Sequence, residues 1–325
     1  MPLAADPAAA VTLEDVRAAA RLLEGIAVRT PLMNLPALAD QAGVPVALKC
    51  EQLQPVGAFK IRGAYNAVAR VAGAGAAAGV VTQSSGNHGQ AVAFAARAFG
   101  LRAVVVMPAS TPLVKVDGVR RHGGEVIFAG AVRSLEQQQR AEEIAWEEGL
   151  TMIPPFDHPD VVAGQGTVGL EILEQQPEVD TVLVPVSGGG LLAGISVALA
   201  GIKPSVRLVA VEPAGAAKLS AALAAGEPRT LERAESMADG LLTRSIGSFT
   251  FPILRRMVRE VVQVTEAEIG EAVRFLHRQA GLRVEPSGAV TTAAILAGRV
   301  RLGGPTVAVV SGGNVDPDLF HRLAE

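Results

Sequence analysis

A lysine at the start of a predicted helix is the most reactive candidate in this sequence. Lys60 follows a Gly-Ala-Phe turn and opens segment 60–71, whose apolar residues recur at helical spacing. The helix dipole disfavours an ammonium in the first turn by a few tenths of a kcal/mol to about 1 kcal/mol. Together with burial, this favours the neutral amine, which is a nucleophile and a base. The alternative is a solvated surface lysine, and only the surrounding residues decide between the two.

A polar turn, QSSGNHGQ at 83–90, carries four side chains that could hold a ligand. Two hydroxyls (Ser84 and Ser85), an amide (Asn87) and an imidazole (His88) lie close together ahead of an apolar helix. Capping that helix needs one serine or asparagine, so the surplus favours a binding site. A metal role for His88 is not expected, because no second histidine lies near it at ligand spacing.

Two glycine turns follow later, SGGGL at 187–191 and SGGN at 311–314. In SGGGL, successive glycines allow several N–H groups to converge on an anion at the start of the next helix. The residues alone support a phosphate site there and a tight turn without a ligand equally, and the serine of SGGN could simply satisfy backbone groups. The motifs GxGxxG and GxxxxGK[ST] are absent, which removes the main support for a dinucleotide or nucleoside-triphosphate site.

The elements that position these residues alternate between short apolar strands and helices. Strands are predicted at 46–49, 79–82, 103–107, 125–128, 151–153, 181–186, 207–212, 260–264 and 306–310. Helices are predicted at 13–23, 60–71, 87–99, 134–148, 166–175, 191–200, 266–280 and 287–298. This order indicates an α/β protein with mostly parallel sheets covered by helices on both faces. All three polar turns follow strands, where open α/β sheets collect their ligands. The proline-rich segment 153–160 predicts a crossing between two lobes.

Composition limits the function further. The 325 residues allow roughly two domains, and the net charge of -3 without a basic block argues against nucleic acid as a partner. Cys50 is the only cysteine, so neither an internal disulfide nor a cysteine-based zinc site is expected. No secretion signal or membrane span is visible. We therefore expect no membrane partner and a soluble, reducing, cytoplasmic setting.

These stretches, in this order, resemble the fold type II pyridoxal-phosphate enzymes, specifically the serine/threonine dehydratase and serine racemase family. The motifs that carry the resemblance are GAFKIRG at 57–63, SSGNHGQ, SGGGL and SGGN. It implies that Lys60 forms the Schiff base with pyridoxal 5'-phosphate, with Phe59 beside the cofactor ring. It also implies that Asn87 hydrogen-bonds the ring 3-oxygen and that Ser311 meets the pyridine nitrogen. The phosphate would lie on Ser187, Gly188, Gly189, Gly190 and Leu191.

The same resemblance implies a two-lobed fold of the tryptophan synthase beta type. The large cofactor domain is expected at 1–76 and 159–325, and the small substrate-side domain at 77–158. A homodimer is the usual state of the family. Because the chain stops soon after SGGN, feedback control through a C-terminal extension is not expected.

The implied reaction is dehydration of a hydroxy amino acid, L-serine or L-threonine, to pyruvate or 2-oxobutyrate plus ammonia. Ser84, Ser85, Asn87 and His88 would bind the substrate carboxylate, and Lys60 would remove the Cα proton. In the racemases, the serine at the position of Ser85 is the acid/base on the opposite face. Racemisation of serine or 3-hydroxyaspartate, or dehydration of a D-substrate, therefore remains an alternative.

Three further residues follow from the resemblance. Arg133 matches an arginine that can reach the distal part of the substrate, and a second carboxylate there would suit 3-hydroxyaspartate. Thr243 falls where relatives carry a serine near the substrate. Relatives with a divalent-cation site pair a glutamate, matched by Glu212, with an aspartate six residues later, but this chain has Lys218. Since an ammonium repels Mg²⁺, we expect no conventional cation site, with Lys218 placed against Glu212 instead.

Overall fold

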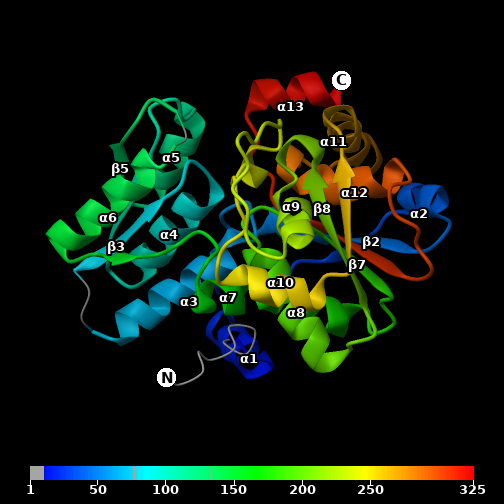
Figure 1. Ribbon diagram of the computed structural model, residues 1–325, viewed down its shortest axis with the longest axis horizontal. Coiled ribbons are helices and arrows are strands. Elements are labelled where there is room, and N and C mark those ends of the chain that lie inside the picture. The colour runs from blue at the N-terminus through cyan, green and yellow to red at the C-terminus, as the bar shows by residue number, and fades with distance from the viewer. Residues whose placement is uncertain (1–10, 76–77, 133) are drawn as a thin grey trace.

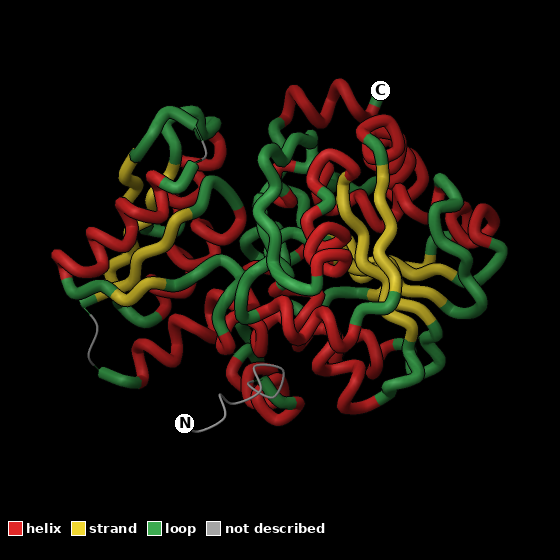
Figure 2. The backbone as a smooth tube through the Cα atoms, in the orientation of Figure 1, coloured by secondary structure: helices red, strands yellow, loops and turns green. Residues whose placement is uncertain are grey.

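The computed structural model describes residues 11–75, 78–132 and 134–325. Its strands form two sheets that lie in separate lobes (Figures 1 and 2). The larger sheet has the strand order β1-β2-β10-β7-β8-β9. Its strands are β1 (Leu32–Asn34), β2 (Val46–Cys50), β7 (Thr181–Pro185), β8 (Arg207–Pro213), β9 (Glu260–Val264) and β10 (Thr306–Val310). All neighbours in it are parallel except β1, which pairs antiparallel with β2 at the edge.

The smaller sheet has the order β5-β4-β3-β6, and all its strands are parallel. Its strands are β3 (Gly79–Gln83), β4 (Arg102–Met107), β5 (Glu125–Phe128) and β6 (Thr151–Met152). One face packs on α3 (Lys60–Gly73), α4 (Asn87–Ala98) and α5 (Leu113–Arg121). The other face packs on α6 (Glu136–Glu148). The strands read as apolar runs because both faces are covered.

Helices also cover both faces of the larger sheet. One core cluster joins it to α1 (Leu13–Leu22), α7 (Pro159–Gln175), α8 (Gly190–Ile202) and α10 (Thr250–Met257). A second cluster joins the opposite face to α2 (Pro36–Ala42), α11 (Glu266–Ala280) and α12 (Pro286–Leu296). Short helices α9 (Lys218–Ala225) and α13 (Pro317–Ala324) complete the lobe. The expected α/β class, with mostly parallel sheets between helices, is confirmed.

All nine strands predicted from the sequence are present, and every end agrees within one residue. Strand β1 was missed, because three residues between Pro31 and Pro36 carry no periodicity. Helices α2, α5, α9, α10 and α13 were not predicted either, since each spans nine residues or fewer, and α5 and α10 also contain a helix breaker, Gly118 or Pro252. Thr12 caps α1, in a reciprocal capping box with Asp15.

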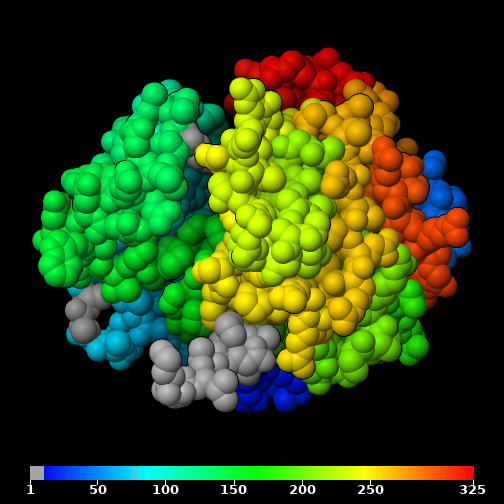
Figure 3. Space-filling view, in the orientation of Figure 1, coloured from blue at the N-terminus to red at the C-terminus, as the bar shows by residue number. Residues whose placement is uncertain are grey.

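The two lobes face one another across a groove (Figure 3). In that view it separates the lobe of the smaller sheet from the segment around residue 240. The carboxyl ends of β3, β7 and β10 carry the three polar turns, and residues 153–158 connect β6 to α7. None of the helices in the described ranges combines the length and the hydrophobicity that crossing a membrane requires.

Candidate active site

Lys60 is the first residue of α3, as the sequence predicts. Its side chain is half-buried, and its Nζ donates a hydrogen bond to the backbone oxygen of Pro155 at 2.6 Å. Burial lowers the pKa of this amine to about 8. The Nζ atom also lies 5.2 Å from the centre of the Phe59 ring. A substantial fraction of the amine is therefore neutral near physiological pH, as a nucleophile requires.

The backbone around Lys60 is fixed from two sides. Phe59 N–H donates to the Ser311 oxygen at 3.1 Å, and Ala58 pairs with Gly312, so the lysine turn is held against the end of β10. Two residues further along α3, Arg62 is buried, and its guanidinium donates twice to Glu51 at 2.8 Å. Arg62 also pairs with Glu171 of α7 at 2.6 Å. These bidentate charged contacts anchor the start of α3 in the large lobe.

The amide of Asn87 connects the first and third polar turns. It is the first residue of α4, and its Nδ2 donates to Glu285 Oε1 at 2.8 Å. Its Oδ1 accepts from Asn314 Nδ2 at 2.9 Å. In the same turn, the Ser84 Oγ accepts the Gly86 N–H at 3.2 Å. The QSSGNHGQ and SGGN turns, far apart in the sequence, thus share one hydrogen-bond network.

His88 lies deeper than its neighbours in the turn. The ring is buried, and burial beside the Lys60 charge lowers its pKa to about 3, so it is neutral. Its Nε2 lies 3.0 Å from the backbone oxygen of Ile153 and must carry the proton, because a carbonyl only accepts. The Nδ1 atom has no hydrogen-bond partner among the described residues. A neutral ring whose proton is already donated cannot pair with a carboxylate, so His88 can contribute to such a site only through its backbone N–H.

The glycine turn has the shape of an anion site. Gly189 adopts φ 102° and precedes α8, whose first turn has no side-chain cap among the described residues. A Cβ at Gly188 would lie 2.4 Å from the Phe156 ring, so the backbone approach requires glycine there. Thr250 Oγ1 donates to the Gly188 oxygen at 2.8 Å. The N–H groups at the start of α8 therefore remain available to a phosphate.

The serines of the two glycine turns lie near further polar groups. Ser187 Oγ is 3.1 Å from Thr243 Oγ1, which places Thr243 beside the glycine turn. Ser311 is buried, and its Oγ donates weakly to the Ser287 oxygen at 3.4 Å. Because this hydrogen bond is long and a hydroxyl proton rotates freely, the Ser311 hydroxyl can instead donate to the ring nitrogen of a bound cofactor.

Two further residues that the sequence singled out remain. Ser85, in the first polar turn, is half-buried. Arg133 lies outside the described residues.

Glu285 is a site residue that the sequence analysis missed. Its carboxyl is buried where the first and third turns meet. Burial, reinforced by the nearby Asp239 charge, raises its pKa to about 8. The sequence did contain a signal. Glu285 directly precedes Pro286 and a helix without charged residues, a context in which a solvent-exposed acid is not expected. Lys115 of α5 also escaped notice, although it forms an ion pair across the groove with Asp239.

Lys218 takes the place expected of it. The side chain is fully buried, and its Nζ donates to the backbone oxygens of Ala216 at 2.6 Å and Leu241 at 2.9 Å. The Nζ also lies 3.9 Å from Glu212 Oε1. Among the described residues no group of three His, Cys, Asp or Glu side chains could hold a metal ion. The ammonium thus lies among three oxygen atoms.

Taken together, the residues suit pyridoxal 5'-phosphate. An amine of lowered pKa can bind an aldehyde, and the uncapped glycine turn can bind a dianion. Asn87 and Ser311 offer polar side chains that can bind the polar atoms of the cofactor ring. Phe156 packs on the glycine turn, and the neighbouring Pro155 contacts Lys60. Amine and phosphate turn therefore flank the same two residues.

Comparisons with known proteins agree with this geometry. The model of a family described as pyridoxal-phosphate dependent enzyme matches residues 23–312. Over 314 residues the chain is 40% identical to an L-threonine ammonia-lyase of Thermotoga maritima, covering 96% of this chain and 78% of the relative. It is 42% identical to a serine racemase of Arabidopsis thaliana, with 89% and 88% covered. The structure of maize serine racemase matches with a TM-score of 0.92 at 36% identity, covering 96% of each chain. The chain belongs to the pyridoxal-phosphate dependent enzymes, in the branch whose members include threonine ammonia-lyases and serine racemases.

Proposed function

We propose that this protein is an L-serine/L-threonine ammonia-lyase that uses pyridoxal 5'-phosphate. The observation that carries the proposal is the amine of Lys60, with its pKa lowered to about 8, at a helix start that the Phe59–Ser311 hydrogen bond holds against the SGGN turn. The names of the relatives support a hydroxy amino acid as substrate, since they include a threonine ammonia-lyase and serine racemases.

Each residue near Lys60 has a defined task in this proposal. The backbone of 187–191 binds the cofactor phosphate, Phe59 lies beside the ring, and Asn87 and Ser311 bind its polar atoms. When bound, the cofactor withdraws electrons from the substrate Cα. The substrate carboxylate binds to the Ser84 and Ser85 hydroxyls and to N–H groups at the start of α4, where the helix dipole favours an anion.

The chemistry then depends on proton transfers by the chain. The neutral Lys60 amine accepts the Cα proton, and the β-hydroxyl leaves with a proton as water. The remaining enamine, as its imine, takes up one water molecule and gives a 2-oxo acid and ammonia. Threonine thus yields 2-oxobutyrate, and serine yields pyruvate, with no net oxidation.

Racemisation is the second candidate function, because Ser85 supplies a hydroxyl within the carboxylate-binding turn. In this version Lys60 removes the Cα proton on one face and Ser85 returns a proton on the other. The substrate would be serine, or 3-hydroxyaspartate if Arg133 binds a second carboxylate. Substitution Ser85→Ala separates the two functions, since it should abolish inversion while retaining elimination from the L-substrate.

The test is an assay of the purified holoenzyme with serine, threonine and 3-hydroxyaspartate in both enantiomeric forms. We expect 2-oxo acid to form faster than the opposite enantiomer, and Lys60→Ala to lose the absorption band of the bound cofactor together with turnover. Enantiomer formation exceeding oxo acid would favour the racemase. Full turnover in Lys60→Ala would overturn both functions.

We propose in addition that the enzyme is a cytoplasmic homodimer without a divalent-cation site. The free thiol of buried Cys50 suits a reducing compartment, and the Lys218 ammonium beside Glu212 suits the lack of a cation. A molecular mass of one chain, measured by sedimentation equilibrium, would refute the dimer. A strong rise in thermal stability on adding Mg²⁺ would refute the proposal that the enzyme lacks a cation site.

A further inference from the structure

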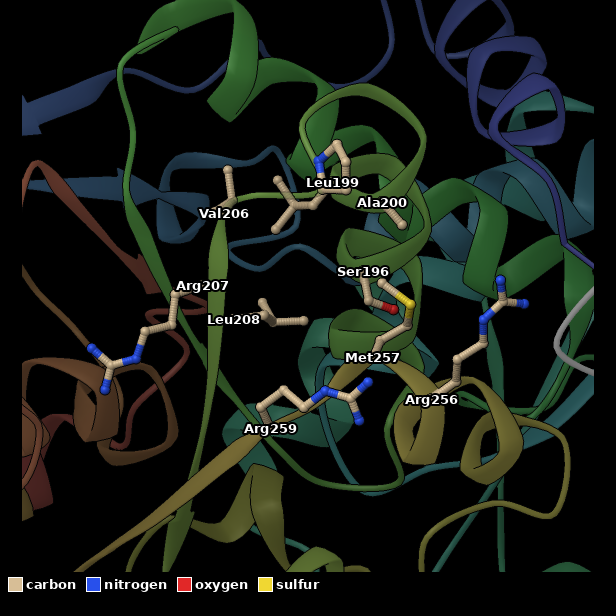
Figure 4. Close-up of a pocket in the computed structure, with 10 residues that line it drawn as sticks. Ser196, Leu199, Ala200, Val206, Arg207, Leu208, Arg256, Met257 and Arg259 are labelled. Atoms are coloured by element: carbon tan, nitrogen blue, oxygen red, sulfur yellow. The ribbon is translucent and has the colours of Figure 1, made fainter.

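A cavity with no part in the chemistry above lies in the large lobe between α8, β8 and the end of α10 (Figure 4). Its volume is about 320 Å³, at the small end of the range for metabolite sites. It is lined by Ser196, Leu199, Ala200, Pro204, Val206, Arg207, Leu208, Arg256, Met257 and Arg259.

The inner wall of this cavity is apolar. Leu199, Val206 and Leu208 are buried core residues that line it, and Met257 is partly exposed at its edge. The hydroxyl of Ser196 already donates to the Ala193 oxygen at 2.7 Å, so its proton is not offered to a ligand. A flexible methionine over aliphatic residues favours a hydrocarbon group, and the lining contains no aromatic ring on which a base could stack.

The outer edge of the cavity is cationic. Arg256 and Arg259 are exposed, and within residues 11–75, 78–132 and 134–325 neither forms an ion pair or a side-chain hydrogen bond. Arg207 differs, because its guanidinium is paired with Glu260 and extends away from Leu208 in Figure 4. Two exposed guanidinium groups without a counter-ion thus lie at the rim of the cavity, that of Arg259 turned toward Met257 and that of Arg256 directed away from it in Figure 4. An arginine in this situation pairs with a carboxylate or phosphate through two parallel hydrogen bonds.

We propose that this cavity binds a small organic anion with an aliphatic body, either a carboxylate or a phosphate monoester. The aliphatic part lies on Leu199, Val206 and Leu208, and the anionic head pairs with Arg256 and Arg259. The site is separate from the catalytic turns, because Ser196 and Leu199 lie six and nine residues along α8 from Gly190. At 1.5 Å per residue this is roughly 9 to 14 Å.

The first experiment is calorimetric titration of the holoenzyme with butanoate, hexanoate, octanoate, octyl phosphate and neutral 1-octanol. Each added methylene should tighten binding about fourfold until the cavity is filled. Octanoate should bind at least tenfold more tightly than 1-octanol, because only the anion pairs with the two arginines. The tighter of octanoate and octyl phosphate identifies the head group. Equal affinity for octanol and octanoate, or no heat from any anion up to about 10 mM, would overturn the proposal.

Variants that remove the arginine charges test whether the ligand binds in this cavity. Arg256→Gln combined with Arg259→Gln should weaken octanoate binding at least tenfold and leave octanol binding unchanged. Arg255→Gln is the matched control, since Arg255 is exposed on the same helix and does not line the cavity. An equal loss in that control would show unspecific attraction and refute the site. Lys60→Ala should bind octanoate as tightly as the unmodified protein, so this result stays separate from any failure of the proposed function.

Discussion

Replacing Glu285 with glutamine should change how stability depends on pH. The amide of the variant would keep the oxygen that accepts from Asn87 and would remove the titrating proton. The native carboxyl holds its proton up to about pH 8, whereas the unfolded one loses it near pH 4.5. Between these values the native state binds one proton more, so its stability falls as pH rises, by about 1.4 kcal/mol per pH unit.

From pH 5 to pH 8 the free energy of unfolding of the unmodified chain should fall by about 3 to 4 kcal/mol through this group. The Glu285→Gln variant should not show this fall. The assay is urea unfolding of the cofactor-free protein at pH 5, 6, 7 and 8, comparing the variant with the unmodified chain. The difference in unfolding free energy between the variant and the unmodified chain cancels the titration of groups common to both, including His88, whose pKa is lowered to about 3. Glu24→Gln, at an exposed glutamate, is the control and should show a constant difference. A difference for Glu285→Gln that is equally constant across the four pH values would refute the buried, protonated carboxyl.

Three further predictions concern the amine, the phosphate turn and the buried ammonium. The rate of cofactor loading should rise about tenfold per pH unit and level off near pH 8, because the pKa of Lys60 is lowered to about 8 and only the neutral amine reacts; stopped-flow absorbance measures this, and a rise that continues to pH 10 would contradict it. Gly188→Ala should raise the cofactor dissociation constant at least about tenfold, since its Cβ would meet the Phe156 ring at 2.4 Å; in a fluorescence titration, unchanged affinity would show that the turn is not the phosphate site. Lys218→Met should lower the free energy of unfolding by about 3 kcal/mol, because it leaves buried Glu212 without its cation; a loss below about 1 kcal/mol in urea unfolding would show that the pair contributes little.

The chemistry was predictable from the sequence where it depends on local pattern. Apolar strands followed by glycine or serine turns placed Lys60, the glycine turn and SGGN at strand ends or a helix start, and the structure has them there. Such patterns work because a buried parallel strand and the helix after it each have their own periodicity.

Residues that act through long-range contacts were not predictable in this way. Glu285 lies 198 positions from Asn87, and Lys115 lies 124 positions from Asp239. No local periodicity encodes either pair, because both arise from the packing of one lobe against the other. The inward turn of His88 was hidden for the same reason, since its partner is the backbone of Ile153 in another segment.

The position of β10 affects how the chain can fold as it is made. This strand lies between β2 and β7, yet it is the last of the three to be synthesised. Until residue 310 has left the ribosome, β2 and β7 each expose an unpaired apolar edge, which is a template for wrong pairing with other chains. Assembly of the larger sheet therefore has to follow translation of residue 310, so the nascent protein should depend on chaperones that shield strand edges.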